Sequence, residues 1–359
     1  MKISLLTIHF GVNHGSILQT IATYHTLVLM GHDVEIINYI PDRYNFFREV
    51  MKKRKNFILK LGYFLLNFIK VRRRRRIFSV FLEKYCKVSR RVRNVEKYFN
   101  NHKPDIALIG SDQVWNSDYN VEHNTNYFLE NVFNLTIISY ASSFGKDVVD
   151  DQEIAKIIPL LKRFSSISVR ELSAVKILEK YGIYSELVLD PTLLLNQDYW
   201  SNYMESIHTS YEKYILIYVM DQSYEPLVKI ANQIKNLTGY NIIMVSFEKY
   251  TGNNIDKSYF NISPGQFLQL FKQCSYVVTN SYHGTLFSIN FSKDFYVVRK
   301  AKYNTRIENI LDIVNLSNRL IDEKITISDY KKIDYNSVKN ILDIHKNKSM
   351  NYIRRSLGE

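Results

Sequence analysis

The stretch YVVTNSYHGTLFSINF, residues 276–291, joins a β-rich run to an apolar run that can form a helix. Residues 276–279 predict a strand, and a helix is expected from Thr285 onward. A turn between a strand and a helix directs backbone N–H groups and the positive end of the helix toward one point, where an anion is stabilised. In that turn, His283 either donates a proton or a charged hydrogen bond to an anion, or simply caps the helix. The stretch therefore predicts a βα unit with a candidate anion site.

The same alternation of strand and helix signals runs along the chain in two series. The first series predicts strands at residues 2–10, 34–39, 106–109, 136–139, 167–169 and 186–189, with helices at 16–30, 95–101, 151–164 and 172–181. The second series predicts strands at residues 214–219, 241–247, 276–279 and 295–299, with helices at 225–237, 264–273 and from Thr285.

Two such series in a chain of 359 residues favour an α/β protein made of two Rossmann-like domains. Ligands of parallel sheets bind beyond the carboxyl ends of the strands, so we expect a site in a cleft between the domains. The boundary is expected near residues 195–210. This gives an N-terminal domain of residues 1–195 and a C-terminal domain of residues 196–359.

The formal net charge of +13 is concentrated in one segment. Residues 52–82 hold eleven of the 48 lysines and arginines and no acidic residue, so the remaining basic residues nearly balance the 35 acidic ones. A charge excess confined to one segment does not favour a protein that binds nucleic acid along its surface.

An apolar run, residues 57–69, lies between the two basic clusters of this segment. It is too short and too interrupted to cross a bilayer. An apolar helix flanked by cations is typical of an element at the surface of an anionic membrane, which is the partner we expect for residues 52–82. The alternative is a core helix with a solvated basic end.

The two cysteines, Cys86 and Cys274, form neither a disulfide framework nor a metal-ligand cluster. Reduced thiols are typical of the cytoplasm, and the N-terminal residues predict a first strand rather than a signal peptide. We therefore expect a cytoplasmic protein that is peripheral on the inner face of the membrane. No metal site and no cofactor are predicted.

Polar motifs follow several predicted strands. After the first strand, Gly15 permits close backbone approach, Ser16 can cap a helix, and Asn13 stands beside them. The further glycines of a dinucleotide-binding fingerprint are absent from this motif.

The motif GSDQVWN, residues 110–116, follows the strand at 106–109. It offers a carboxylate (Asp112), two amides (Gln113 and Asn116) and an indole (Trp115). Such sets bind sugars through hydrogen bonds and ring stacking. A capped turn with a packed tryptophan is the alternative.

Two arginines also lie at strand or helix ends. Arg170 follows the strand at 167–169, where it can hold a carboxylate or phosphate, or form a salt bridge with Glu171. Arg306 lies at a predicted helix start, where it is either an anion ligand or a solvated surface residue.

Six motifs in this order resemble the polysaccharide pyruvyl transferase family, over roughly residues 1–310. They are residues 13–20, 110–116, 139–145, 168–171, 189–192 and 279–284. The resemblance implies the two-domain architecture called GT-B, with phosphoenolpyruvate as donor and a sugar residue of a capsule or exopolysaccharide, or of its lipid-linked precursor, as acceptor. It implies a cyclic ketal as product and phosphate as leaving group.

The resemblance also implies roles for the motif residues, with the acceptor on the N-terminal domain and the donor on the C-terminal domain. His283 is expected to act as general acid or as a hydrogen-bond donor to the leaving phosphate. Arg170 is expected to hold the donor's anionic groups, and Asp112 to orient or deprotonate the acceptor hydroxyl. Donor-binding residues are then Ser281, Tyr282, Gly284 and Arg306, and acceptor-binding residues are Asn13, Gly15, Ser16, Gln113, Trp115 and Asn116.

The sequence departs from the family pattern at one position. Many members have an arginine directly before the histidine, where this chain has Tyr282. The missing anion contact is then lost or supplied by Arg306 or Arg170.

Two other functions fit the same motifs. A GT-B glycosyltransferase that uses a nucleotide-sugar would need the same cleft and anion site. A catalytically silent glycan-binding or membrane-associated protein would keep the sugar site without turnover.

Overall fold

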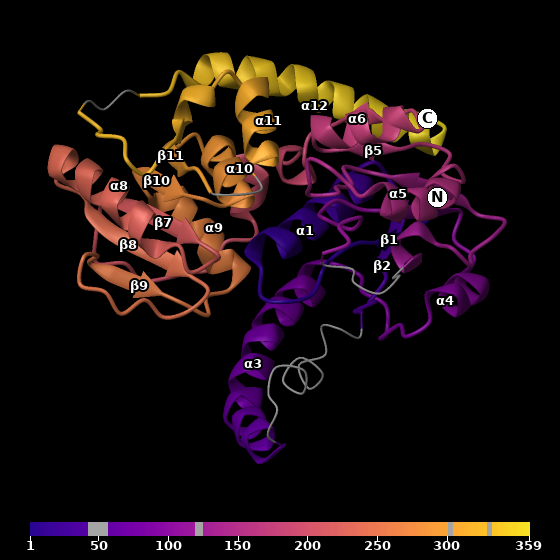
Figure 1. Cartoon of the computed structure of the whole chain (residues 1–359), viewed down its shortest axis with the longest axis horizontal. Coiled ribbons are helices and arrows are strands. Elements are labelled where there is room, and N and C mark those ends of the chain that lie inside the picture. Colours follow the sequence, from indigo (N-terminus) through magenta and orange to yellow (C-terminus); the bar gives the residue numbers. More distant parts are fainter. Residues whose placement is uncertain (42–56, 119–124, 301–303, 329–331) are drawn as a thin grey trace. The chain divides into compact units, whose positions relative to one another are not determined.

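Two parallel sheets organise the chain in this computed structural model (Figure 1). The structure describes residues 1–41, 57–118, 125–300, 304–328 and 332–359, without the side chains of residues 57–70. The first basic cluster, residues 52–55, therefore lies outside the described residues. The apolar run at 57–69 is described in its backbone alone. The chain forms two units, residues 1–170 with 174–187 and residues 171–173 with 188–359, here called unit 1 and unit 2. The domain division at residue 195 stays a prediction.

Unit 1 is built on a four-stranded sheet in the order β2-β1-β3-β4, and every pairing in it is parallel. All four residues of β3 are buried, as expected for a strand covered on both faces. A short parallel pair, β5-β6, adjoins β4 through an isolated bridge between Ile138 and Ser166. The strands are β1 (Lys2–Leu6), β2 (Asp33–Ile36), β3 (Ile106–Ile109), β4 (Thr136–Ser139), β5 (Ser168–Val169) and β6 (Glu186–Leu187).

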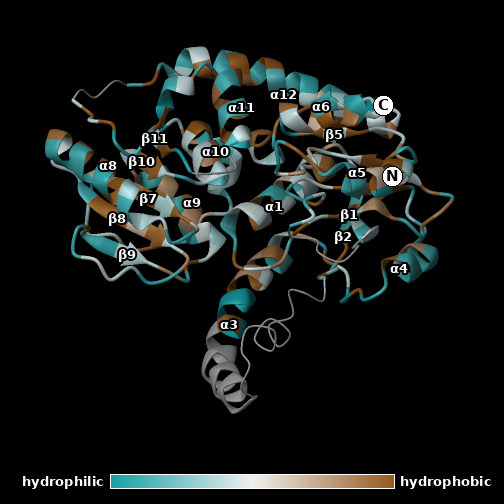
Figure 2. Ribbon diagram, in the orientation of Figure 1, coloured by the Kyte–Doolittle hydropathy of each residue, from teal (hydrophilic) through white to brown (hydrophobic). Residues whose placement is uncertain are grey.

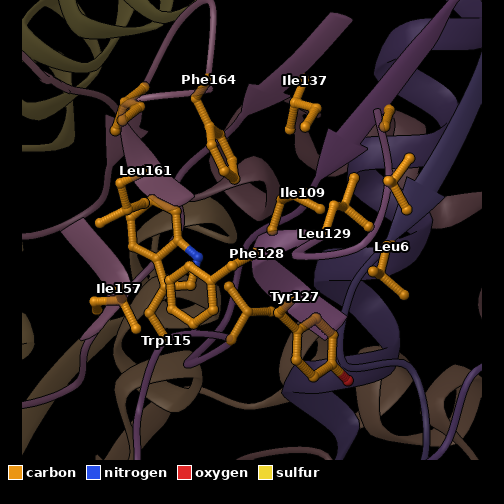
Figure 3. Close-up of a cluster of buried hydrophobic side chains, with 14 of the residues drawn as sticks. Leu6, Ile109, Trp115, Tyr127, Phe128, Leu129, Ile137, Ile157, Leu161 and Phe164 are labelled. Carbon is orange, nitrogen blue, oxygen red and sulfur yellow. The ribbon is translucent and has the colours of Figure 1, made fainter. Parts of the chain in front are cut away.

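The core of unit 1 is rich in aromatic rings. Figure 3 shows the indole of Trp115 among Phe128, Leu161 and Phe164. Its ring stacks on Phe128 at a centroid distance of 5.9 Å and meets Phe164 edge-on at 6.1 Å. The described helices of this part of the chain are α1 (His14–Leu29), α3 (Phe57–Tyr85), α4 (Val95–His102), η2 (Thr125–Phe128), α5 (Asp151–Leu161) and α6 (Leu172–Lys180).

Helix α3 is longer than the apolar run predicted at residues 57–69, because it continues through the arginine cluster to Tyr85. Figure 2 shows a hydrophilic band on α3 next to its grey part. Beyond this band the helix packs on α1. Phe78 is buried against the ring of His14 at 5.1 Å, and His25 Nε2 lies 3.0 Å from the Tyr85 carbonyl. The end of α3 is thus anchored to unit 1. None of the described helices combines the length and the apolarity needed to cross a bilayer.

Unit 2 is built on a six-stranded sheet in the order β12-β11-β10-β7-β8-β9, again with parallel pairings. The strands are β7 (Tyr214–Val219), β8 (Asn241–Ser246), β9 (Lys257–Tyr259), β10 (Tyr276–Thr279), β11 (Asp294–Val298) and β12 (Leu320–Ile321). The helices are η3 (Pro191–Leu193), α7 (Gln197–Ser201), α8 (Tyr224–Thr238), α9 (Pro264–Gln273), α10 (Tyr282–Asn290), α11 (Thr305–Ile313), η4 (Ser317–Arg319) and α12 (Tyr335–Leu357).

The quoted stretch forms the expected strand and helix, but the helix begins earlier than predicted. Helix α10 starts at Tyr282 rather than at Thr285, because Ser281 is its N-cap and accepts a hydrogen bond from the Gly284 N–H. His283 therefore lies in the first turn of the helix and not in the preceding turn.

Candidate active site

In unit 1, Asp112 lies in the turn after β3 and gathers three hydrogen-bond donors. Its Oδ1 accepts from the Arg170 guanidinium at 3.2 Å and from the Gln113 N–H at 2.9 Å, and its Oδ2 accepts from Ser16 Oγ at 2.7 Å. The backbone of Asp112 has φ 78°, a left-handed conformation that asparagine and aspartate tolerate best. A carboxylate that receives three hydrogen bonds is held in a fixed orientation, which suits a positioning role.

Arg170 follows β5 and is fully buried, with 0% of its side chain exposed. The register of unit 1 explains its approach to Asp112, because isolated parallel bridges connect Asp112 to Ser142 and Ser142 to Val169. The turn after β3 and the end of β5 are therefore neighbours through Ser142. A buried charge must be compensated, and the ion pair with Asp112 provides this.

Asn13, Gly15 and Ser16 lie at the start of α1. Asn13 is the N-cap, and its Oδ1 accepts hydrogen bonds from the N–H groups of Gly15 at 2.9 Å and Ser16 at 3.4 Å. The capping function expected of Ser16 thus belongs to Asn13. Ser16 Oγ instead donates to Asp112 Oδ2, which connects the segment after β1 to the turn after β3.

The amides of the 110–116 motif bond to each other, while its indole is in the core. Asn116 Nδ2 donates to Gln113 Oε1 at 2.8 Å, and a Cβ at Gly145 would lie only 2.0 Å from the same oxygen. Trp115 is 2% exposed and packs between phenylalanines, so its ring face cannot stack on a sugar in this structure. The sequence left two interpretations of this motif, a sugar-binding set and a capped turn with a packed tryptophan. The second describes Trp115.

In unit 2, His283 lies beside an aspartate that did not figure among the predicted site residues. His283 Nε2 is 3.9 Å from Asp190 Oδ2, and both side chains are at least nine-tenths buried. Asp190 is held in turn by Thr192, whose N–H and Oγ1 donate to its Oδ1 at 3.0 and 2.8 Å. At 3.9 Å the two atoms are too far apart for a hydrogen bond, so the Asp190 carboxylate is a nearby negative charge that would balance a positive charge on the ring. The motif at residues 189–192 was the sequence signal for Asp190.

Arg306 lies over the ring of Tyr282, with the guanidinium carbon 5.4 Å from the ring centroid. Tyr282 in turn meets the ring of His283 edge-on at 5.3 Å. The structure thus brings Arg306 from the start of α11 to the start of α10, next to the position where many family members have an arginine. A cation–π contact with an aromatic ring is a favourable place for that charge.

A second polar cluster of unit 2 lies at the strand ends and was missed by the sequence reasoning. Asp221 accepts hydrogen bonds from Lys300 Nζ at 2.8 Å and from Asn280 Nδ2 at 3.1 Å. These residues follow β11, β10 and β7 within two positions, so the expectation that ligand-binding residues lie just beyond the carboxyl ends of parallel strands could have found them. Burial acts to raise the pKa of Asp221, but Lys300 and the Asn280 amide outweigh it and hold that pKa below its ordinary value.

The structure therefore brings Ser16, Asp112 and Arg170 together in unit 1, and Tyr282, His283 and Arg306 together in unit 2. The expected meeting of His283 with Arg170 on one anion stays a prediction. Among the described residues, no group of three or more His, Cys, Asp or Glu side chains could hold a metal ion.

The fold is that of the GT-B class, with two parallel α/β sheets. A UDP-GlcNAc 2-epimerase from Methanocaldococcus jannaschii matches with 14% identity, 100% of this chain and 99% of that chain covered, and a TM-score of 0.51. MnaA of S. aureus in a structure with UDP matches with 10% identity, 98% and 90% covered, and a TM-score of 0.54. These likenesses confirm the predicted fold class.

A family model narrows this class. The model described as "Polysaccharide pyruvyl transferase" matches residues 13–301, and the chain belongs to this family. Membership makes the protein a transferase, as the motifs implied. A comparison with curated proteins gives no match.

Proposed function

We propose that the protein transfers the pyruvyl group of phosphoenolpyruvate onto a sugar residue of a cell-surface polysaccharide or of its lipid-linked precursor. The observation that carries this proposal is the placement of His283, beside Asp190 and next to Tyr282 and Arg306, in the first turn of α10. The family match covers the same residues except Arg306.

The donor carries a phosphate and a carboxylate, so its site needs several positive groups. The first turn of α10 offers the positive end of the helix dipole, with the Gly284 N–H itself donating to Ser281 Oγ. Arg306 adds a guanidinium beside this turn. We propose that Ser281, Tyr282, Gly284 and Arg306 bind phosphoenolpyruvate here.

The reaction moves protons from sugar hydroxyls to the donor. As the first hydroxyl oxygen bonds to C2 of the enol and loses its proton to Asp112 or the solvent, C3 accepts a proton, and the bond from C2 to the phosphate oxygen then breaks. The second hydroxyl bonds to C2 and closes the ketal, and its proton leaves with the phosphate or the solvent. His283 supplies the proton to C3 or a charged hydrogen bond to the departing phosphate.

The acceptor is assigned to unit 1. Asp112 orients or deprotonates the acceptor hydroxyl. Arg170 was expected to hold the anionic groups of the donor, but its guanidinium is paired with Asp112, so we propose that it holds that carboxylate in place. The remaining acceptor residues of this proposal are Asn13, Gly15, Ser16, Gln113 and Asn116, without Trp115, which is part of the core. We further propose that residues 52–82 hold the enzyme at the inner face of an anionic membrane, where lipid-linked acceptors lie.

A donor screen tests the proposal. Wild-type protein and His283→Ala are incubated with a sugar acceptor and either phosphoenolpyruvate or a nucleotide-sugar, and the release of phosphate or nucleotide is measured. We expect phosphate release from phosphoenolpyruvate, lowered about 10²- to 10⁴-fold in His283→Ala, as for the loss of a positioned acid. His345→Ala in α12 is the matched control and should keep wild-type turnover.

Nucleotide release without phosphate release would replace this proposal by a nucleotide-sugar glycosyltransferase. Sugar binding without turnover of any donor would replace it by a silent binding protein. Wild-type turnover in His283→Ala would remove the histidine from the mechanism.

A further inference from the structure

Lys300 forms an ion pair across the end of a strand in unit 2. The sheet of this unit places β10 between β11 and β7 (Figure 1). Lys300 lies two residues after β11 and Asp221 two residues after β7, and Lys300 Nζ is 2.8 Å from Asp221 Oδ2. The Lys300 side chain therefore spans the carboxyl end of β10, at the edge where α/β sheets bind their ligands.

The residue at that end of β10 connects the ion pair to α10. Asn280 directly follows β10, is 2% exposed, and donates through Nδ2 to Asp221 Oδ1 at 3.1 Å. The next residue, Ser281, is the N-cap of α10. The ammonium group of Lys300 thus lies beside the start of α10, where the donor is proposed to bind.

The backbone of Lys300 is also held next to the start of α11. The Lys300 N–H donates to Asn304 Oδ1 at 2.9 Å, and Asn304 Nδ2 donates to the Lys300 carbonyl at 2.7 Å. Asn304 directly precedes α11, and Arg306 is the second residue of that helix. One asparagine side chain therefore holds two cations at the same end of the sheet: Lys300, next to Asn280, and Arg306, over the ring of Tyr282.

The proposed donor has a separate anionic group for each of these cations. Carbon C2 of phosphoenolpyruvate carries a carboxylate and, through an oxygen, a phosphate. Arg170, which was also expected to hold the donor, is paired with Asp112 in unit 1. A planar guanidinium matches the several oxygens of a phosphate, whereas an ammonium group is a compact charge that suits a single carboxylate contact. Arg306 therefore fits the phosphate, and Lys300 fits the carboxylate.

The Lys300 ammonium group can contact a ligand without leaving Asp221. An ammonium group has three N–H donors, and the contact with Asp221 takes one of them. The side chains of the pair are 31% and 38% exposed, so a ligand can reach this end of the sheet. Asp221 Oδ1 also accepts from the Ser223 N–H at 3.1 Å, so the carboxylate that holds Lys300 is itself fixed.

We propose that Lys300 is a further donor-binding residue, which holds the carboxylate of phosphoenolpyruvate at the end of β10. Asp221 is a positioning residue: it fixes the ammonium group of Lys300 and does not touch the donor. The proposal rests on the proposed function, because it names the group that recognises the carboxylate of that donor. It also explains how the site distinguishes phosphoenolpyruvate from a phosphate ester that has no carboxylate.

The test compares the binding of two ligands to the full chain by titration calorimetry. Phosphoenolpyruvate carries both anionic groups, and ethyl phosphate keeps the phosphate ester but lacks the carboxylate. We expect the wild type to bind phosphoenolpyruvate at least about tenfold more tightly than ethyl phosphate. Lys300→Met should weaken phosphoenolpyruvate by about 10- to 100-fold, the loss expected when a hydrogen bond to a charged group is removed. Ethyl phosphate should weaken by less than about threefold, since a partly exposed charge that it does not contact is screened.

Asp221→Asn tests the positioning role. Without the ion pair, Lys300 loses its fixed orientation, so phosphoenolpyruvate should bind about two- to tenfold more weakly, while ethyl phosphate changes little. A purely structural role of Asp221 would weaken both ligands equally. Tighter binding of phosphoenolpyruvate would show that this carboxylate competes with the donor, and either result would contradict the positioning role.

Lys235→Met is the matched control. Lys235 pairs with Asp256 at 2.7 Å, and the two side chains are 35% and 25% exposed, which is close to the exposure of the Lys300 pair. Asp256 directly precedes β9, so this pair lies at the amino end of a strand of the same sheet. Its replacement removes the same charge and should change the affinity for either ligand by less than about twofold.

Two results with Lys300→Met would overturn the proposal. Equal loss of phosphoenolpyruvate and ethyl phosphate would show that the lysine does not recognise the carboxylate. An effect equal to that of Lys235→Met would show that only the overall charge of the unit matters.

Turnover separates this proposal from the proposed function. A Lys300→Met enzyme that releases phosphate from phosphoenolpyruvate and binds it with wild-type affinity would remove Lys300 from the donor site and leave the proposed function standing. Nucleotide release by the wild type in the donor screen would instead remove phosphoenolpyruvate as the donor.

Discussion

The Arg170 guanidinium donates to the Asp112 carboxylate at 3.2 Å inside unit 1, where 0% and 9% of the two side chains are exposed. Removal of one member leaves the other charge buried without its partner, which costs about 3–5 kcal/mol. We therefore expect Asp112→Ala to lower the free energy of unfolding by about this amount. Urea unfolding followed by circular dichroism measures it.

An ion pair of the same unit whose carboxylate is exposed serves as the control for this prediction. Asp118 lies 2.9 Å from Lys146, and 53% of its side chain is exposed. Exposed pairs contribute about 0–1 kcal/mol, so Asp118→Ala should change the stability little. If Asp112→Ala lowered the free energy of unfolding as little as Asp118→Ala, the buried pair would not hold the turn after β3 and the end of β5 together.

Gly284 allows α10 to approach β10 closely. A Cβ at this position would lie 2.4 Å from Thr279 Oγ1 and 2.9 Å from the ring of Tyr218. Thr279 cannot easily turn away, because its Oγ1 donates to the Tyr218 carbonyl and accepts from the Ser281 N–H. Overpacking of this kind costs about 1–3 kcal/mol. Gly284→Ala should therefore be destabilising, although alanine favours a helix.

Thermal unfolding followed by calorimetry tests this prediction. Lys229→Ala, at an exposed position of α8, is the control and should stay within about 0.5 kcal/mol of the wild type. A Gly284→Ala protein as stable as the wild type would show that the contact is looser than the structure has it.

The ion pair of Asp221 with Lys300 predicts a pH dependence in the acid range. The pKa of Asp221 is lowered in the folded chain, so its contribution to stability is present above the ordinary value of 3.8. That contribution is lost as the pH falls through the lower, folded-state pKa. Asp221→Asn should therefore be less stable than the wild type at neutral pH, and the difference should shrink below pH 3.8.

Unfolding free energies of both proteins, measured at a series of pH values between neutral and strongly acid, give this difference directly. A difference that stays the same at every pH would show that the carboxylate charge of Asp221 does not contribute to folding.

The arginine cluster at residues 72–76 holds the basic side chains of the predicted membrane segment that the structure describes. Each basic residue near an anionic surface contributes about 1 kcal/mol to binding. Neutralisation of all five arginines should therefore abolish co-sedimentation with vesicles that contain anionic lipid, and vesicles of neutral lipid serve as the control. Equal sedimentation of both proteins with anionic vesicles would remove these arginines from membrane binding.

Buried strands were the most predictable part of the fold. The strands at 106–109, 136–139, 214–219 and 276–279 have the predicted bounds, because runs of apolar and β-branched residues with all or most side chains buried leave little ambiguity. Helix α9 also has its predicted bounds, since Pro264 at its first position and the Ser263 capping box define its start.

Two of the missed elements depend on contacts that a local pattern does not contain. Helix α12 and strands β9 and β12 were not predicted. β9 pairs with β8 over three residues and β12 with β11 over two, so their existence depends on the neighbouring strand. The start of α10 was placed at Thr285 because His283 and Gly284 were read as a turn, although Ser281 already caps the helix.

In the candidate site too, the residues set by the local sequence pattern were predicted and those set by packing were missed. Ser16, Asp112 and Arg170 were predicted as site residues because each follows a predicted strand. The structure brings them together because parallel strands end at one edge of the sheet. Asp190 was not among the predicted site residues, because its approach to His283 depends on how the segment after β6 packs against α10. Trp115 was offered as a sugar platform because a sequence does not show which face of a turn enters the core.

The chain has one tryptophan in each unit, so fluorescence can follow each unit separately. Trp115 is buried in unit 1, and Trp200 is buried in unit 2, where its Nε1 donates to the Thr192 carbonyl at 3.2 Å. Because the chain contains only these two indoles, each Trp→Phe variant keeps a single intrinsic fluorophore in a known half of the molecule. Emission spectra recorded during denaturation would then report whether the halves melt in one step or one after the other.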